Sequence, residues 1–198
     1  MLLLLLNTLL FIGGFILWTF TEYGLHNWAG HLPRGRHQVS REHLEHHRNL
    51  DYFTPASRKV YLALPVVAIL TGICVSFSVV VVQSVGFGAM VAFGFVVGWT
   101  WYEVLHRRIH THAPLNAYGT WARRHHFHHH FADHKLNHGV TTDLWDRVFA
   151  TRATPERIRI PERKVLPWML DSTTGDIATG FASHYQLVRR RRRLAPSR

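Results

Sequence analysis

The sequence has 198 residues, a length typical of one domain, and it combines a net charge of +11 with 17 histidines. Its hydrophobic fraction of 47% is ordinary for a soluble protein, but its 35 Lys, Arg, Asp and Glu residues all lie outside residues 1–21 and 60–102. Segregation this strong excludes an ordinary soluble globular protein.

The two uncharged segments are long enough for three membrane spans. A bilayer core about 30 Å thick requires about 20 apolar residues per helix. We therefore predict spans over approximately residues 1–21, 60–82 and 87–102, with residues 83–86 as a tight turn. A cleaved signal peptide is the alternative for the first segment. That segment lacks a basic amino-terminal region and a small-residue cleavage site, which favours a retained anchor.

The distribution of basic residues predicts the orientation of these spans. Lys and Arg are in excess on one side, and the positive-inside rule places that side in the cytoplasm. The histidine-rich blocks 22–59 and 103–151 and the basic tail 152–198 would then be cytoplasmic. The arginine run at 189–193 is expected to contact anionic lipid headgroups. We favour this over nucleic-acid binding, so no nucleic-acid partner is expected.

The predicted fold class is all-α, in a single domain covering residues 1–198. Three transmembrane helices are capped by a cytosolic, helical, histidine-rich metal-binding domain. No strand pattern of any length appears, and the prolines after residue 154 indicate an irregular segment with short elements. Pro65 falls early in the second span, where it either kinks or begins that helix.

Ten histidines occur in four spaced motifs. EYGLHNWAGH contains H-x4-H, REHLEHHR contains H-x2-HH, YEVLHRRIH contains H-x3-H, and HHFHHHF contains H-x2-HH. The histidines concerned are His26, His31, His43, His46, His47, His106, His110, His126, His129 and His130. Positions i, i+3 and i+4 share one face of an α-helix, so the last three motifs each form a stripe. The first pair diverges on such a helix, and we expect His31 beyond the helix end, past Gly30.

Imidazole is the commonest neutral metal ligand. Ten such ligands are too many for one ion and suit two ions with open positions. A lone motif of this kind is more often a surface feature, but four blocks on one side of the membrane reinforce one another. Four carboxylates are candidates for orienting the histidines: Glu22, Glu45, Glu103 and Asp133. Glu103 forms a Glu-x-x-His spacing with His106 and is also a candidate metal ligand, although orienting a histidine is its simpler role. We expect no catalytic residues beyond the metal ligands.

The ordered set of motifs resembles the fatty acid hydroxylase/sterol desaturase superfamily of membrane di-metal oxygenases. It is most similar to fatty acid 2-hydroxylases, through EYGLH, YEVLH and GVTTDLWDRVFAT, over residues 18–151. The resemblance implies that the ten histidines bind two metal ions. It implies iron in the functional protein, with zinc as an alternative metal in isolated protein. It also implies O2-dependent hydroxylation or desaturation of a lipid C–H bond, with the bilayer supplying a fatty acyl substrate. Aromatic residues at the boundary are candidates for lining the path of that substrate, although an interfacial belt is the simpler role for each: Trp18, Phe20, Trp99 and Trp101.

The sequence departs from this family's pattern in three ways. Members usually have four spans, and we expect the first span predicted here to correspond to their second, as in a natural short form or after a missed start codon. The 198 residues contain no recognisable cytochrome b5 domain, so we expect a separate cytochrome b5 or ferredoxin to supply electrons. The last block also allows a register one residue earlier, and the histidines left unassigned are His112, His125, His128, His134 and His138.

Two readings other than acyl hydroxylation stay open. The same chemistry in other family branches acts on sterols or carotenoids. A non-catalytic metal-binding or metal-buffering membrane protein is an alternative of a different class. A transporter is disfavoured because transport places ionisable residues inside the spans, and these spans contain none.

Overall fold

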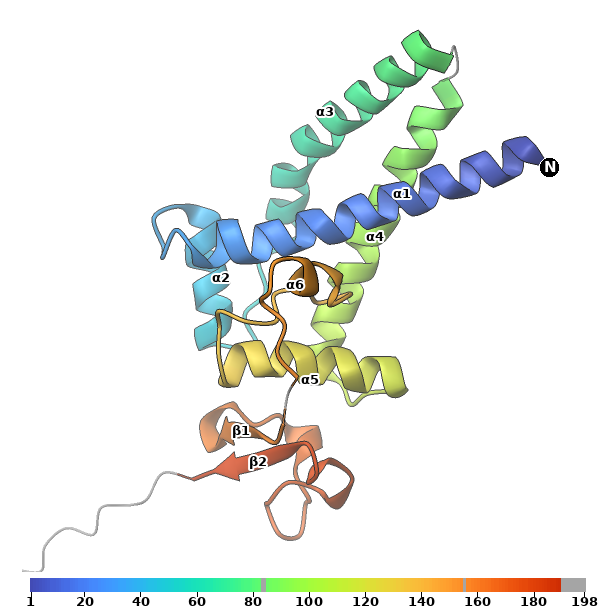
Figure 1. The fold of residues 1–198 in the computed structure, drawn as a ribbon. Helices are drawn as coiled ribbons and strands as arrows, with labels where there is room; N and C mark the ends of the chain where they lie inside the picture. Colours follow the sequence, from blue (N-terminus) through green and yellow to red (C-terminus); the bar gives the residue numbers. More distant parts are fainter. Residues whose placement is uncertain (83–84, 155, 190–198) are drawn as a thin grey trace, which may run out of the picture.

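The computed structural model describes residues 1–82, 85–154 and 156–189, and the described chain is mostly helical. In chain order its elements are α1 (Leu2–Gly24), the π-helix η1 (Leu25–His31), α2 (Gln38–Arg48), α3 (Ala56–Val82), α4 (Val85–Thr111), α5 (Ala117–Phe131), α6 (Leu144–Val148), β1 (Ile158–Pro161), the 3-10 helices η2 (Glu162–Lys164), η3 (Pro167–Met169) and η4 (Thr179–Phe181), and β2 (Tyr185–Val188). Figure 1 shows α3 and α4 as a hairpin that α1 crosses, with α2, α5 and α6 gathered at one end.

Three helices are long and apolar enough to cross a membrane: Leu2–His31, Ala56–Val81 and Val85–Thr111. This agrees with the three spans predicted from the sequence. Two of these helices continue well beyond their uncharged segments. Helix α4 therefore ends in one pair of histidines, and the helix formed by α1 and η1 ends in another pair. Pro65 lies inside α3 and does not begin it. Of the predicted turn, residues 83–84 lie outside the described residues, and α4 begins at Val85.

Close contact between α1 and α4 fixes the relative positions of these histidine-bearing ends. A Cβ atom added to Gly14 would lie 2.0 Å from the carbonyl oxygen of Val91, and one added to Gly94 would lie 2.0 Å from that of Phe11. Only glycine permits two helix backbones to approach this closely, a use of small residues that is common between membrane helices. Any side chain at either position would force α1 and α4 apart.

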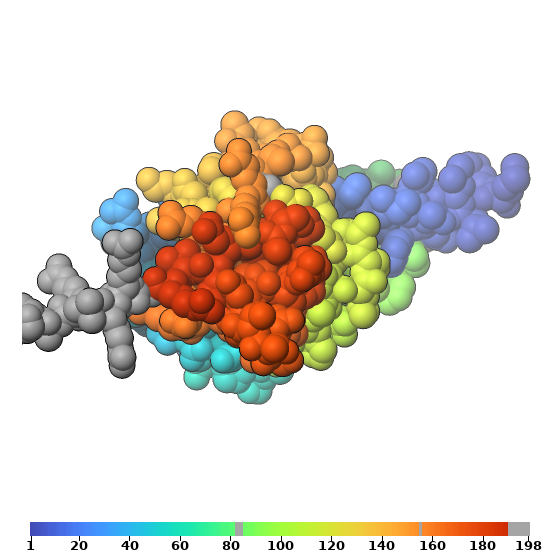
Figure 2. Space-filling view, turned by 90° about the horizontal axis from the view of Figure 1, so that it is seen from below, coloured from blue at the N-terminus to red at the C-terminus, as the bar shows by residue number. Residues whose placement is uncertain are grey.

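The carboxy-terminal segment contains the main departure from the predicted secondary structure. Strands β1 and β2 form a two-stranded parallel sheet in which Ile158 pairs with Tyr185. Neither strand was expected from the sequence, because each has only four residues and the two partners are far apart in the chain. Figure 2 shows this segment spread over one end of the molecule. Of the predicted lipid-binding run at 189–193, residues 190–193 lie outside the described residues.

The small sheet holds α5 in place through the main hydrophobic core. Phe127 of α5, Ile160 of β1 and Met169 are all fully buried in one cluster. Arg123, also on α5, is buried and donates from Nε to the carbonyl oxygen of Ile109, at 3.1 Å, near the end of α4. Helix α5 is therefore fixed to both the core and α4, and its opposite face is free to carry histidines.

Candidate metal centre

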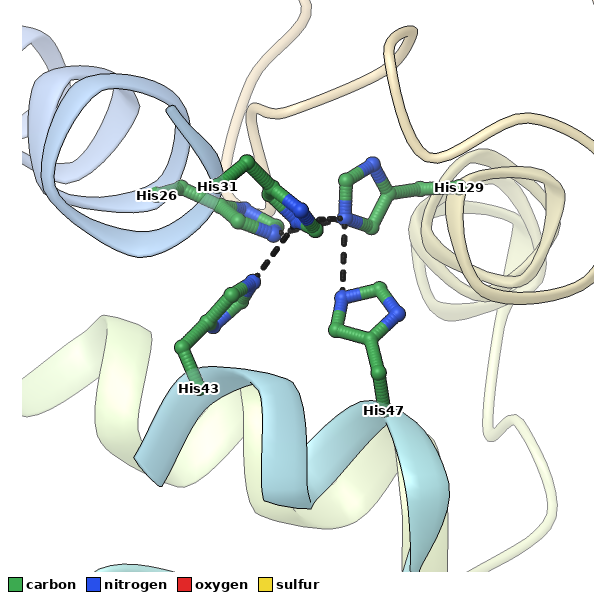
Figure 3. Close-up of side chains that lie close together, drawn as sticks. All are labelled: His26, His31, His43, His47 and His129. Carbon is green, nitrogen blue, oxygen red and sulfur yellow. Dashed lines mark hydrogen bonds between the residues drawn. The ribbon is translucent and has the colours of Figure 1, made fainter. Parts of the chain in front are cut away.

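All ten histidines of the four motifs lie in two compact groups. Within each group, one nitrogen from every histidine lies within 4.8 Å of the others. We call them cluster A and cluster B. Cluster A contains His26, His31, His43, His47 and His129, and cluster B contains His46, His106, His110, His126 and His130. Six of the ten histidines are buried, and the other four are partly buried. Figure 3 shows the imidazoles of cluster A converging from η1, α2 and α5.

The nitrogen atoms at the centre of cluster A are very close together. Nε2 of His129 lies 2.9 Å from Nε2 of both His26 and His31, and 3.1 Å from Nε2 of His47. Nε2 of His43 lies 2.8 Å from that of His31. Ligand atoms that share one metal ion at about 2.0–2.1 Å are themselves separated by about 3 Å, so these spacings fit a common ion.

The π-helix explains how His26 and His31 reach the same cluster. A π-helix has i→i+5 hydrogen bonds, so residues five apart lie one turn apart. The amide of Leu32 bonds the carbonyl oxygen of Asn27 in this pattern, at 3.1 Å, and the His26 and His31 rings stack with centroids 5.5 Å apart. The expectation that His31 lies beyond the helix end was wrong, because an α-helical turn was assumed.

Cluster B has a similar arrangement built from α2, α4 and α5. Nε2 of His126 lies 3.1 Å from Nε2 of His106, 2.9 Å from that of His110 and 3.0 Å from that of His130. Nε2 of His46 lies 3.2 Å from that of His110. Fully buried His126 therefore occupies the same central position in cluster B that His129 occupies in cluster A.

Each H-x2-HH motif divides its histidines between the two clusters. In α2, the i and i+4 residues His43 and His47 join cluster A, while His46 joins cluster B. In α5 the assignment is reversed, since His126 and His130 join cluster B and His129 joins cluster A. Two shared helices therefore hold the clusters side by side.

The structure brings together only one of the two registers considered for the last motif. His126, His129 and His130 point into the clusters, whereas Nε2 of His125 contacts Asp146 at 3.1 Å. His128 is only partly buried, on another side of α5. Among the other unassigned histidines, His134 and His138 lie beside cluster A, and His112 is exposed.

The clusters are built from neutral imidazoles. Burial lowers the pKa of His46 to about 4. Burial also lowers the pKa of four further histidines outside the candidate spans to well below the usual value. These are His43, His126, His129 and His130. Neutral imidazole is the form that binds metal, so these side chains need not lose a proton before they bind a cation near neutral pH.

Hydrogen bonds at the outer ring nitrogens set the tautomers. Nδ1 of His129 lies 2.8 Å from the carbonyl oxygen of Leu136. Nδ1 of His26 likewise contacts the carbonyl oxygen of His138. Because a carbonyl only accepts, each Nδ1 carries the proton and each Nε2 presents a lone pair. Two lone pairs 2.9 Å apart repel one another, and a cation between them removes that repulsion. The donor set of cluster A therefore fits a metal ion.

The four candidate carboxylates have varied surroundings. Glu22 is buried and accepts hydrogen bonds from the amides of Val140 and Thr141. Glu103 pairs with Lys59 at 2.6 Å. The other two carboxylates are partly buried. Glu45 pairs with Arg48, and Asp133 accepts a hydrogen bond from the amide of Lys135. In each of these contacts the carboxylate pairs with a backbone amide or a basic side chain and not with an imidazole nitrogen.

Asp146 was not among the carboxylates predicted from the sequence, although its side chain contacts the imidazole of His125. Asp146 is fully buried and accepts from Nε2 of His125, the amides of His138 and Gly139, and the hydroxyl of Thr151. Burial alone would raise its pKa, but the hydrogen bonds from His125 and Thr151 lower it. Its place within the quoted GVTTDLWDRVFAT motif was the available signal.

An apolar cavity of about 430 Å³ leads from the spanning helices to both clusters. The cavity-facing positions of α3 run from Lys59 to Val67, and those of α4 from Phe95 to His106. Histidines of both clusters line it: His26 and His43 of cluster A, and His46 and His106 of cluster B. Of the four aromatic residues considered for this path, Trp18 and Trp99 line it.

A second, more polar cavity of about 350 Å³ reaches the clusters from another side. His31, His47 and His129 of cluster A line it together with His130 of cluster B. Lys164 and Asp133 also line it, and Nζ of Lys164 donates to the carbonyl oxygen of His47 at 2.6 Å. The paired clusters are therefore accessible both from an apolar side and from a polar side.

Three candidate spans and two buried clusters of imidazoles define a multi-pass membrane protein with a paired metal-type site. A model of the fatty acid hydroxylase family matches residues 11–151, and the chain therefore belongs to that family. It is 28% identical over 151 residues to fatty acid 2-hydroxylase of Mus musculus, an alignment that covers 72% of this chain and 39% of that protein.

Other relatives have similar names. The ceramide very long chain fatty acid hydroxylase scs7 of Schizosaccharomyces pombe is 28% identical, over 71% of this chain and 41% of that protein. A solved structure of full-length scs7p, in which only the hydroxylase domain is visible, matches with a TM-score of 0.60 and 25% identity, covering 76% of this chain and 57% of that one. The chain thus spans about two fifths of the length of the mouse and fission yeast relatives.

Proposed function

We propose that this chain is a membrane-bound, O2-dependent di-iron oxygenase that hydroxylates a C–H bond of a fatty acyl lipid. The observation that carries the proposal is the apolar cavity, whose walls combine apolar residues of the spanning helices with histidines of both clusters. Family membership supports the lipid substrate and the reaction type, because the relatives are named as fatty acid and ceramide fatty acid hydroxylases.

The proposed substrate path follows the helices. Leu62 and Val66 line the cavity, and both residues are exposed on α3, a helix long and apolar enough to cross a membrane. We propose that an acyl chain enters the cavity from the bilayer beside α3 without crossing water. Further along, Tyr102 and His106 of α4 line the same cavity. The apolar walls would exclude water and hold the chain with selected carbons beside the clusters.

We assign the binding of the two metal ions to the ten histidines. Iron bound there would supply the activation of O2 that removal of a hydrogen from an unactivated C–H bond requires. One oxygen atom enters the lipid as a hydroxyl group and the other leaves as water, so the reaction consumes two electrons and two protons. The chain's own residues contribute the neutral imidazoles, their fixed orientation and a dry cavity.

The polar cavity supports a separate role for the opposite side of the clusters. Partly buried His31 and His47 line it beside Lys164, so water, protons and electrons can arrive there without passing the lipid. We propose that a separate electron donor, of the cytochrome b5 or ferredoxin type, approaches from this side. We propose that this side faces the cytoplasm, a proposal that the excess of Lys and Arg supports under the positive-inside rule.

The proposal is tested by expressing the chain in cells supplied with isotope-labelled O2 and profiling all lipids. We expect hydroxylated acyl lipids that contain one labelled oxygen atom and are missing from cells that express His46→Ala. His184→Ala is the matched control, because His184 belongs to neither cluster and lies between η4 and β2 in the carboxy-terminal segment. Normal metal content without any labelled lipid would refute hydroxylation and would favour a metal-buffering role. Unsaturated lipids without label would point to desaturation.

A further inference from the structure

The segment between α5 and α6 supplies two backbone carbonyl groups to cluster A. The carbonyl oxygen of Leu136 accepts from Nδ1 of His129, and that of His138 accepts from Nδ1 of His26. Both bonds direct Nε2 of the histidine toward the centre of the cluster. Two ligands from different helices therefore depend on one short stretch of backbone for their orientation.

Asp146 holds this stretch of backbone in place. One carboxylate oxygen accepts from the amide of His138 at 2.8 Å and from the hydroxyl of Thr151 at 2.7 Å. The other accepts from the amide of Gly139 at 2.8 Å. A Cβ atom added to Gly139 would lie 3.0 Å from that second oxygen and 2.0 Å from the carbonyl oxygen of Thr142. The backbone therefore packs directly onto the carboxylate.

No hydrogen bond from this segment reaches a ring nitrogen of cluster B within the described part of the chain. Nδ1 of His46 contacts the carbonyl oxygen of Tyr52, which follows α2, at 2.9 Å. Nδ1 of His110, His126 and His130 is buried and has no hydrogen-bond partner within the described part of the chain. The two clusters thus use the same kind of ligand but differ in what orients those ligands.

We propose that Asp146 is a positioning residue that sets the metal affinity of cluster A and leaves that of cluster B unchanged. The inference rests on the proposed function only in requiring that the clusters bind metal. Partners that orient a metal-binding histidine typically change metal affinity by about 10-fold to 100-fold when they are removed. The two sites should therefore respond differently to Asp146→Asn, which keeps the shape of the side chain but removes its charge and one acceptor.

The test uses two parent variants of the full chain, each with one cluster disabled. His106→Ala/His110→Ala retains cluster A, and His31→Ala/His43→Ala retains cluster B. Zinc affinity is measured in detergent by competition with a chelator of known affinity. We expect Asp146→Asn to weaken zinc binding about 10-fold to 100-fold in the first parent, and to leave zinc binding in the second parent unchanged.

Asp143→Asn is the matched control, because Asp143 lies three residues earlier and pairs with exposed Arg147 and Arg152. It should change neither affinity. Equal losses in both parents, or no loss in the first, would overturn the role of Asp146. Absence of zinc binding by the unmodified chain would instead overturn the proposed function. If Asp146→Asn does not fold, Thr151→Val removes one hydrogen bond to the same carboxylate and should give a smaller loss confined to the first parent.

Discussion

The imidazole rings of His47 and His130 stack with centroids 4.1 Å apart and planes inclined by 15°, although His47 belongs to cluster A and His130 to cluster B. This contact joins α2 to α5 at the boundary between the clusters. Because each of these helices supplies histidines to both clusters, neither cluster can form with only one of them in place. The paired arrangement follows from this sharing.

The register of the last histidine motif gives the first prediction. His129→Ala should abolish labelled hydroxylated lipid and reduce the metal content, because Nε2 of His129 is the central atom of cluster A. His128→Ala should retain both, because His128 belongs to neither cluster. Lipid profiling and metal analysis of the two variants check this. Loss of activity in His128→Ala would instead support the register one residue earlier, which consists of His125, His128 and His129.

Gly30 gives a second prediction, about the space around cluster A. A Cβ atom added to Gly30 would lie 2.8 Å from Cδ2 of His43, so Gly30→Ala should displace that ring and weaken metal binding at cluster A. Gly13→Ala is the matched control, since a Cβ atom there would meet nothing within 4 Å. Metal content after dialysis against a weak chelator measures both. Equal retention of metal by the two variants would show that the His43 ring can move aside.

A third prediction concerns the pH dependence of metal-free protein. The unfolded pKa of His46 is 6.5 and burial lowers it to about 4 in the folded state. Unfolded chains therefore bind more protons between these values, and the free energy of unfolding falls as the pH falls from about 6.5 to about 4. His46 alone accounts for about 3 kcal/mol over this window. Thermal unfolding of chelator-treated protein at a series of pH values tests this, and a melting temperature that is constant from neutral pH to pH 4 would contradict it.

The apolar cavity gives a fourth prediction. Ala63 of α3 lines the cavity, whereas Ala68 on the same helix is exposed and does not line it. Ala63→Phe should reduce the yield of hydroxylated lipid at least about tenfold by occupying the acyl path, while the metal content stays normal. Ala68→Phe should leave both unchanged. Equal yields from the two variants would show that the substrate does not use this cavity.

Much of the site could be predicted because its residues follow the α-helical period. The pairs His43 and His47, His106 and His110, and His126 and His130 are each four residues apart, and each pair meets in one cluster. Three spans could be predicted because their segments contain no charge. The assignment of each histidine to a particular cluster could not be predicted, because it depends on how α2 and α5 are rotated about their axes.

Other features lacked a local signal. The π-helix at Leu25–His31 has no simple sequence period that separates it from an α-helix, so the pair His26 and His31 was expected to diverge. Strands β1 and β2 are too short to show alternation, and their pairing is non-local. Asp146 acts through contacts with residues 125, 138, 139 and 151, which only the folded loop brings together.

The central claim is that the ten histidines form two separate metal sites. Metal analysis of the purified chain in detergent tests it most directly. We predict about two ions per chain for the unmodified protein, and about one ion each for His31→Ala/His43→Ala and for His106→Ala/His110→Ala, following the division into two clusters. A single ion per chain in the unmodified protein, or loss of all metal from both double variants, would contradict two separate sites.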